Sequence, residues 1–218
     1  MRLGIVPRKR EVPPDLHAAH RYGVRATGIT LSAEQRDFTV ARAAERGLTD
    51  SVEVRLQDYR DFDGNSAGAF DAVASIEMGE QVGERLYPSY VAVLDRALRP
   101  GCRLLLQQMS RRADAAPGGG PFIEAYIAPD MHMRPLWQTL RYLQDAGFEI
   151  RSVAAVREHY ARTAEHWMNT LESRFGEFVA LQGEEVARVW RLYLAGGILA
   201  FEEGRMGVDQ VLAVKPGR

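Results

Sequence analysis

The sequence predicts an α/β protein built on a parallel sheet, and three observations carry this prediction. Short apolar runs alternate with helical patterns through the first two thirds of the chain. The run Arg103–Met109 is continuously apolar at its start, which is typical of a strand covered on both faces. Two long segments with helical apolar spacing then precede a final strand. Strands that alternate with helices favour a parallel sheet with right-handed crossovers.

Helix boundaries follow from capping and breaking residues. Ser32, with Gln35 three positions later, has the spacing of a capping box and predicts a helix that Gly47 stops. The helix Leu86–Leu98 ends before Pro100 for the same kind of reason. The other predicted helical segments are Leu16–Tyr22, Pro135–Ala146, Thr163–Phe178 and Glu184–Glu203.

Strands and loops occupy the segments between these helices. The predicted strands are Leu3–Val6, Val24–Thr30, Val52–Leu56, Phe70–Ile76, Arg103–Met109, Glu149–Val156 and Gln210–Val214. Arg8–Pro14 is basic and broken by proline, so it is expected to be a loop. Arg111–Gly120 is polar and glycine-rich, and we expect it to be a mobile loop.

Length and composition limit the classes of protein to which this chain can belong. A chain of 218 residues fits one domain, with or without a helical appendage. The net charge of −1 and the pI of about 6.5 predict no nucleic-acid partner. The single Cys102 excludes an internal disulfide and fits a reducing compartment. No apolar run reaches the roughly 18 residues of a membrane span, and Met1–Asp15 lacks the apolar core of a signal peptide.

An acidic turn follows the strand Phe70–Ile76. The next seven residues, Glu77–Gly83, contain two carboxylates and two glycines. Ligands of open α/β sheets bind beyond the carboxyl ends of the strands, so a carboxylate here favours a chemical role. The alternative for Glu80 is a structural one, in which it complements a helix dipole.

Polar residues also follow the second and third predicted strands. Thr30 and Gln35 stand where a doubly wound sheet normally faces the ribose of a nucleotide. The alternative is a strand end and a helix cap that contact no ligand. Asp58 can accept a hydrogen bond from an adenine amino group, and Tyr59 can stack on the ring; as an alternative, both are solvated loop residues.

Three blocks together resemble the cyclopropane-fatty-acid synthase family. They are GVRATGITLSAEQ (Gly23–Gln35), VEVRLQDYRDF (Val52–Phe62) and FDAVASIEMGEQVG (Phe70–Gly83). With the tail Arg188–Val214, the resemblance extends from Leu16 to about Pro216. It implies a Rossmann-like class I methyltransferase sheet, with residues 163–204 as a helical insert on the lipid side before the last strand. The whole chain, 1–218, would be one such domain with a divergent or truncated start at 1–15.

The family's activity is methylation of the double bond of an unsaturated fatty acyl chain with S-adenosylmethionine, giving cyclopropane, methyl-branched or methylene-branched products. The residues that match its cofactor contacts are Thr30, Leu31, Gln35, Asp58 and Tyr59.

The resemblance also implies a catalytic set. Alkene π electrons attack the sulfonium methyl, and the carbocation that results must be stabilised and then lose a proton. In the family the counterpart of Glu80 helps hold a bicarbonate that takes this proton, and the other holders match Gln107, Met109 and Tyr160. Cyclopropane synthases commonly have His where Gln107 stands, and an amide cannot relay a proton, which weakens the cyclopropane outcome in particular.

Two further segments match the family. Tyr160 lies in an HYxRT pattern (159–163), where its ring could stabilise a cation and its hydroxyl could hold an anion; the alternative is a packing tyrosine. Pro121–Ile127 resembles the segment that lines the acyl tunnel. Asp130 and His132 with two flanking methionines form a poor ligand set, so no metal site is predicted.

One family feature is missing from the start of the chain. The glycine-rich turn D-I-G-C-G-W-G corresponds here to Val6–Val12, VPRKREV, which contains no glycine. Glycines at this place let the backbone approach the methionine part of the cofactor. Two explanations stay open: a fragment or altered start of an active enzyme, or a degenerate homologue that binds lipid or a partner without methylating. A methyltransferase for small molecules is disfavoured by the matches at Glu80, Tyr160 and Pro121–Ile127.

The resemblance sets the expectations for partners and location. The partner would be the unsaturated acyl chain of a phospholipid, with contact to a membrane surface and a homodimer both compatible with it. The expected location is cytoplasmic, at or near the inner face of the membrane.

Overall fold

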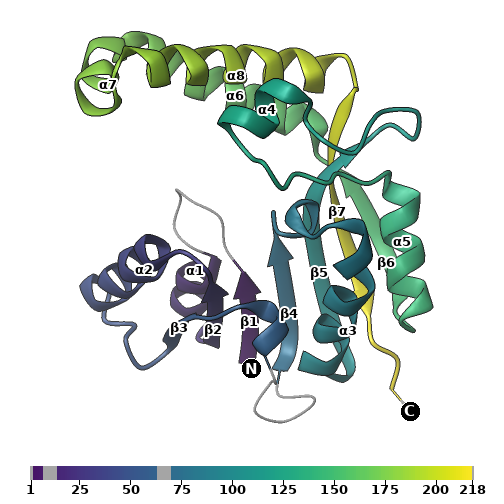
Figure 1. The fold of residues 1–218 in the computed structure, drawn as a ribbon. Coiled ribbons are helices and arrows are strands. Elements are labelled where there is room, and N and C mark those ends of the chain that lie inside the picture. The colour runs from purple at the N-terminus through teal and green to yellow at the C-terminus, as the bar shows by residue number, and fades with distance from the viewer. Residues whose placement is uncertain (1, 7–13, 63–69, 218) are drawn as a thin grey trace.

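The computed structural model describes residues 2–6, 14–62 and 70–217, with side chains from residue 14 onward (Figure 1). The glycine-free stretch VPRKREV therefore lies outside the described residues except for the backbone of Val6.

The described strands form one seven-stranded sheet in the order β3-β2-β1-β4-β5-β7-β6. Their bounds are β1 Arg2–Val6, β2 Arg25–Thr30, β3 Val52–Leu56, β4 Phe70–Ile76, β5 Leu98–Arg111, β6 Glu149–Ala155 and β7 Met206–Val214. The first five strands are parallel, as predicted. β7 runs antiparallel to both β5 and β6, which corrects the prediction of a parallel sheet.

The direction of β7 follows from the helices that precede it. They are α6 Arg157–Ser173, α7 Phe175–Gln182 and α8 Glu184–Glu202. All three lie beyond the carboxyl edge of the sheet, where β6 ends, and the chain leaves α8 at that same edge (Figure 1). β7 can only run back from there, so it enters the sheet opposite to its neighbours.

Four other helices follow the predictions with small shifts. They are α1 Pro14–Tyr22, α2 Ala33–Glu45, α3 Tyr87–Ala97 and α5 Leu136–Asp145. The short helix α4 Pro121–Tyr126 was not predicted. The predicted helix Thr163–Phe178 is wrong in extent. In the structure α6 begins six residues earlier. The helix is interrupted at Arg174, whose φ of −122° is not helical.

Helices cover the sheet on both faces. Val52 of β3 packs against α1 and α2 with Leu16, Ala19 and Ala43. Through β2 and β1, the register puts Val52 in line with Ala72 of β4. The next residue, Val73, points to the opposite face because side chains alternate along a strand. There it joins the main core beneath α3 and α5.

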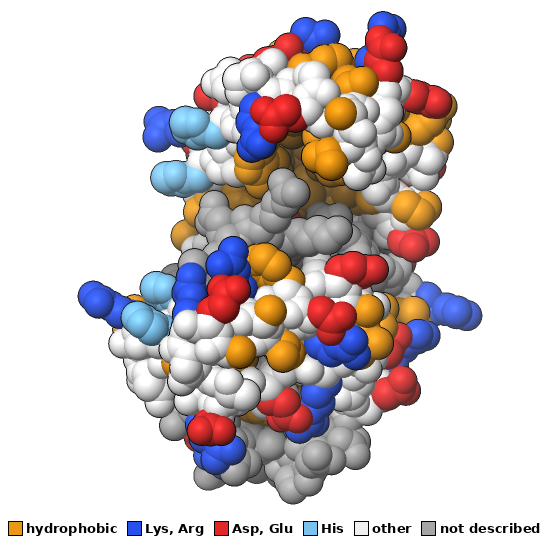
Figure 2. Space-filling view, turned by 90° about the vertical axis from the view of Figure 1, so that its left-hand side faces the viewer, with side chains coloured by type: hydrophobic (Ala, Val, Ile, Leu, Met, Phe, Trp, Pro, Cys, Tyr) orange, Lys and Arg blue, Asp and Glu red, His pale blue; other side chains and the backbone are white. Residues whose placement is uncertain are grey.

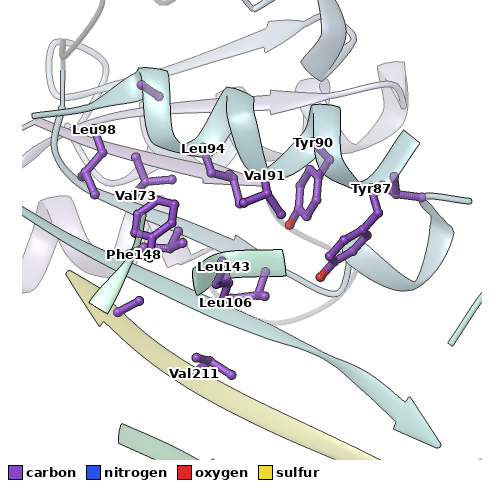
Figure 3. Close-up of a cluster of buried hydrophobic side chains, with 14 of the residues drawn as sticks. Val73, Tyr87, Tyr90, Val91, Leu94, Leu98, Leu106, Leu143, Phe148 and Val211 are labelled. Carbon is purple, nitrogen blue, oxygen red and sulfur yellow. The ribbon is translucent and has the colours of Figure 1, made fainter. Parts of the chain in front are cut away.

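The main core buries two tyrosines as well as aliphatic side chains. Figure 3 shows Tyr87 and Tyr90 of α3 beside Leu94, over strands that carry Leu106 and Val211. Each phenol has a partner, which a buried hydroxyl needs. Tyr90 shares a hydrogen bond of 2.5 Å with the Ser75 hydroxyl, and Tyr87 donates to Gln108 at 2.8 Å. These bonds fix α3 against the ends of β4 and β5.

α6 and α8 pack along each other above the carboxyl edge of the sheet (Figure 1). The surface is hollowed between the helical lobe, formed by α6, α7 and α8, and the part of the protein that contains the sheet. Hydrophobic side chains gather on the side of the helical lobe that faces this hollow (Figure 2). Among the described helices, none combines the length and apolar character that crossing a membrane requires.

Candidate active site

The acidic turn begins with a strained residue. Glu77 follows β4 and has a φ of +55°, the one positive φ of a non-glycine among the described residues. This left-handed conformation is uncommon for a residue with a Cβ. The Glu77 amide donates to the carbonyl of Gln107 at 2.8 Å, so the end of β5 holds it in place. The turn continues through 3₁₀ segments at Gly79–Gln81 and Glu84–Leu86.

A buried arginine holds this turn. The Arg134 side chain is fully buried; it donates from Nη1 to the Gly79 carbonyl at 3.0 Å and from Nη2 to the Val82 carbonyl at 2.6 Å. Its guanidinium carbon lies 3.8 Å from the centre of the Tyr87 ring. These contacts fix the backbone on both sides of Glu80, a carboxylate that is itself fully buried.

His132 and the methionines on either side of it have structural contacts. His132 shares a hydrogen bond with Glu84 at 3.1 Å, and Met131 and Met133 are buried in an apolar cluster. No group of three metal-ligating side chains occurs in the described part of the chain.

A hydrogen-bonded network joins the acidic turn after β4 to β5, α6 and β7. Tyr160 donates its hydroxyl to Glu77 Oε1 at 2.7 Å, and Gln107 Nε2 donates to the same oxygen at 3.1 Å. Gln107 Nε2 also lies 2.7 Å from the Tyr160 hydroxyl, and Gln210 Nε2 donates to Gln107 Oε1 at 2.6 Å. Two of the three residues predicted as catalytic, Gln107 and Tyr160, are thus in direct contact.

The surroundings of Tyr160 keep its phenol protonated. Burial, the Glu77 carboxylate and then Glu80 together raise the pKa of Tyr160 far above its usual value. The phenol is therefore neutral and able to donate at physiological pH. The carboxylate that accepts its hydrogen bond is Glu77, which is not among the predicted site residues. The signal was present, since Glu77 is the other carboxylate of the turn, but the resemblance pointed to Glu80.

The polar end of β2 is ordered by its own hydrogen bonds. Thr30 donates its hydroxyl to Gln35 Oε1 at 2.6 Å and accepts from the Ser32 amide at 3.1 Å. Ser32 caps α2 by accepting from the Gln35 amide at 3.2 Å. The capping prediction is therefore right for Ser32, while the Gln35 side chain is held by Thr30. The hydrogen bond with Thr30 uses the Oε1 atom of Gln35 and does not involve its Nε2 group. The Leu31 side chain, next to Thr30 in the chain, is exposed.

The end of β3 lies directly beside the end of β2, where the Gln57 amide donates to the Thr30 carbonyl at 3.0 Å. Asp58 follows and bonds to Arg60, whose hydrogen bond lowers the pKa of the Asp58 carboxyl. The Tyr59 ring packs edge-on against Tyr90, with the ring centres 5.6 Å apart. Stacking of Tyr59 on an adenine ring stays a prediction.

These strand ends fit an adenosine-type cofactor in their chemistry. An ionised acceptor at Asp58 and a fixed amide at Gln35 stand at neighbouring carboxyl ends of one sheet. A carboxylate offers more acceptor sites than Arg60 alone uses.

An apolar cluster adjoins the network. Tyr160 packs against Phe201 of α8, with ring centres 5.7 Å apart. Ile123 and Ile127, from the segment that resembles the acyl tunnel, pack on the same cluster. Its buried members are Met109, Ala128, Met131, Met133, Ala161, Phe201 and Val208. The polar network thus lies at the border of a region lined by hydrocarbon and thioether side chains.

Gly79 allows the acidic turn to approach β5 closely. A Cβ at this position would lie 1.9 Å from Gln108 Oε1, and Gln108 is held by Tyr87 and Thr139. We expect Gly79→Ala to lower the free energy of unfolding by about 1–3 kcal/mol through overpacking. Gly83→Ala is the matched control because a Cβ there meets nothing within 4 Å. Equal unfolding midpoints for the two variants in urea would contradict this packing.

Comparison with known proteins gives the family. The family described as mycolic acid cyclopropane synthetase matches residues 15–211. The "Probable fatty acid methyltransferase" of Pseudomonas putida is 38% identical over 203 residues, which cover 91% of this chain and 51% of that protein. "Tuberculostearic acid methyltransferase UfaA1" of Mycobacterium tuberculosis is 35% identical over 208 residues, which cover 93% of this chain and 47% of that protein.

The fold has a close counterpart among solved structures. The mycolic acid cyclopropane synthase CmaA1, complexed with SAH and CTAB, superposes with a TM-score of 0.86 at 25% identity, covering 99% of this chain and 78% of that one. The chain spans about half the length of the two relatives named above. The predicted class I methyltransferase fold is confirmed, and the chain belongs to the mycolic acid cyclopropane synthetase family.

Proposed function

We propose that this protein transfers a methyl group from S-adenosylmethionine to the double bond of an unsaturated fatty acyl chain of a phospholipid. The observation that carries the proposal is the network of Glu77, Gln107 and Tyr160 at the border of an apolar cluster. Relatives named as fatty acid methyltransferases support the lipid substrate.

The cofactor supplies an electrophilic methyl group on a sulfonium. Thr30 and Gln35 would hold its ribose, and Asp58 would accept from its adenine, because Thr30 ends β2 and bonds to Gln35, while Asp58 follows the end of the neighbouring β3. Leu31 and Tyr59 would cover the apolar surface of the nucleoside. The acyl chain would lie against the cluster that contains Phe201 and borders Tyr160, since apolar side chains bind hydrocarbon best.

The reaction places positive charge on the acyl chain, and the site is suited to stabilise it. The face of the Tyr160 ring attracts cations, and Glu80 in its ionised form would add a negative charge nearby. The resemblance assigns removal of the proton to a bicarbonate held by Glu80, Met109, Gln107 and Tyr160. The amide of Gln107 and the neutral phenol of Tyr160 are both donors suited to an oxyanion.

Peripheral contact with the membrane is part of the proposal, with the protein at the cytoplasmic face. Exposed apolar side chains on the helical insert support it, among them Trp167, Leu181 and Leu192. A homodimer is compatible with this placement.

A non-catalytic lipid- or partner-binding protein is the competing proposal, favoured by the glycine-free stretch at residues 6–12. Each lost hydrogen bond to a charged group costs about 1.5–3 kcal/mol, so two or three losses weaken cofactor binding by orders of magnitude. We therefore expect calorimetric titration of this chain with S-adenosylmethionine to give a dissociation constant weaker than micromolar. Micromolar or tighter binding would show that another segment replaces the turn and would favour the enzyme.

A further inference from the structure

A single oxygen atom, Glu77 Oε1, accepts hydrogen bonds from the two donors that the resemblance assigns to bicarbonate binding. Tyr160 and Gln107 each donate to Glu77 Oε1, at 2.7 and 3.1 Å. A carboxylate of the chain itself therefore stands where an external oxyanion would accept these two bonds. Because both bonds end on Oε1, the second oxygen, Oε2, keeps its lone pairs within this network.

The backbone is shaped to keep the carboxylate there. Glu77 adopts a φ of +55°, which is costly for a residue with a Cβ, and its amide is tied to the Gln107 carbonyl. Gln107 is in turn fixed by Gln210. Three separate elements, β5, α6 and β7, thus contribute to placing a single side chain.

Charge argues against a second anion at the same place. Gln107, Gln210 and the neutral Tyr160 donate hydrogen bonds but carry no positive charge. A bicarbonate bound to them would face the Glu77 carboxylate at hydrogen-bonding range of the same donors, and like charges at close range repel strongly in a partly buried site.

We propose that the Glu77 carboxylate occupies the oxyanion position of this site and is the base that takes the proton released after methyl transfer. This inference rests on the proposed function. Glu80 is the less suitable base because its side chain is fully buried among the tyrosines of α3, whereas Glu77 is partly exposed and touches Tyr160 directly.

The step balances without an oxidant or reductant. The π pair of the alkene forms the new carbon–carbon bond, and the methyl–sulfur bond breaks with its pair left on sulfur. The cation on the acyl chain then loses a proton to a Glu77 oxygen, giving the neutral acid. If the proton leaves the transferred methyl group, the released C–H pair bonds to the cationic carbon and closes a three-membered ring. If it leaves a carbon bonded directly to the cationic carbon, the pair forms a carbon–carbon double bond.

The first experiment needs no turnover. In Glu77→Gly the backbone keeps its conformation, since glycine accepts a φ of +55°, and the carboxylate is removed. Sodium bicarbonate is titrated at constant pH and ionic strength, with sodium chloride as the reference, while the side-chain amide of Gln107 is followed by ¹⁵N–¹H NMR. Gln107→Met identifies that signal by its absence.

We expect a saturable shift of the Gln107 signal in Glu77→Gly and none in the wild type. Glu77→Gln, which fills the same space with an amide, should also show none. A wild-type shift equal to that of Glu77→Gly would overturn the inference, because the anion would then bind beside Glu77. Absence of a shift in folded Glu77→Gly would overturn it as well.

The second experiment measures turnover of an oleoyl phospholipid in buffer freed of carbon dioxide. It uses the version of the chain that carries the family's glycine turn at residues 6–12, with Glu77 intact as the wild type and the two Glu77 substitutions as variants. We expect wild-type activity to be independent of added bicarbonate, and both variants to lose at least about 100-fold. Bicarbonate should restore part of the activity of Glu77→Gly and none of Glu77→Gln. A wild type that requires bicarbonate would contradict the inference. If the wild type turns over no acyl substrate, the proposed function fails, and the Gln107 signal still decides whether Glu77 fills the oxyanion position.

Discussion

Replacing Glu80 with glutamine is expected to lower methyl-transfer turnover at least about 100-fold, the scale on which preorganised charge contributes to catalysis. The side chain is fully buried, and its charge acts on Tyr160, whose raised pKa it helps to set. Glutamine keeps the shape of the side chain and removes the negative charge that would stabilise the cation on the acyl chain.

The measurement is transfer of labelled methyl to an oleoyl phospholipid. It is made with this chain and with a version that carries the family's glycine turn at residues 6–12. Glu53→Gln is the control, since Glu53 forms an exposed ion pair with Arg55 away from the site. Tyr160→Phe keeps the ring, so it should retain some methyl transfer while losing efficient proton removal. Wild-type turnover in both Glu80→Gln and Tyr160→Phe would mean that the two residues only support the fold.

Arg134→Met should give the largest loss of stability, about 3 kcal/mol in the free energy of unfolding. The substitution removes a charged donor from two buried carbonyls, those of Gly79 and Val82, and each such bond contributes about 1.5–3 kcal/mol. Methionine fills much of the space and recovers part of the loss through apolar burial.

Arg141→Met is the matched control because Arg141 pairs with Asp145 on the surface of α5. Its effect should stay within about 0.5 kcal/mol, as is usual for exposed positions. Urea unfolding followed by circular dichroism compares the two variants. Similar midpoints would show that Arg134 does not hold the acidic turn.

The elements best predicted from sequence are those whose signals are local. Val52–Leu56 and Phe70–Ile76 match the structure at both ends, because the first alternates apolar and charged residues and the second is mostly apolar, and both patterns are typical of short strands. The interruption between α6 and α7 was not predicted because it falls at Arg174, which is neither a glycine nor a proline. The direction of β7 depends on where α8 ends, which no pattern within the strand reveals.

The site residues that were predicted are likewise those with local sequence signals. Gln107 and Tyr160 were identified from motif matches, and the structure brings them into contact although 53 positions separate them in the chain. Glu77 and Glu80 look alike in the sequence, three residues apart, and only the positive φ of Glu77 turns its carboxylate toward Tyr160. Arg134 was missed because arginine is rarely buried, so nothing in its neighbourhood predicts a role inside the protein.

The most direct test of the central claim is the mass of the acyl chain after incubation. Vesicles of dioleoyl phospholipid are mixed with S-adenosylmethionine and either this chain or the version with the glycine turn restored, and the fatty acids are analysed by mass spectrometry. We expect the restored version to add one methylene unit to the oleoyl chain, with the product lost in Glu80→Gln. A restored protein that binds the cofactor and leaves every acyl chain unchanged would contradict the assignment and favour a non-catalytic lipid-binding role.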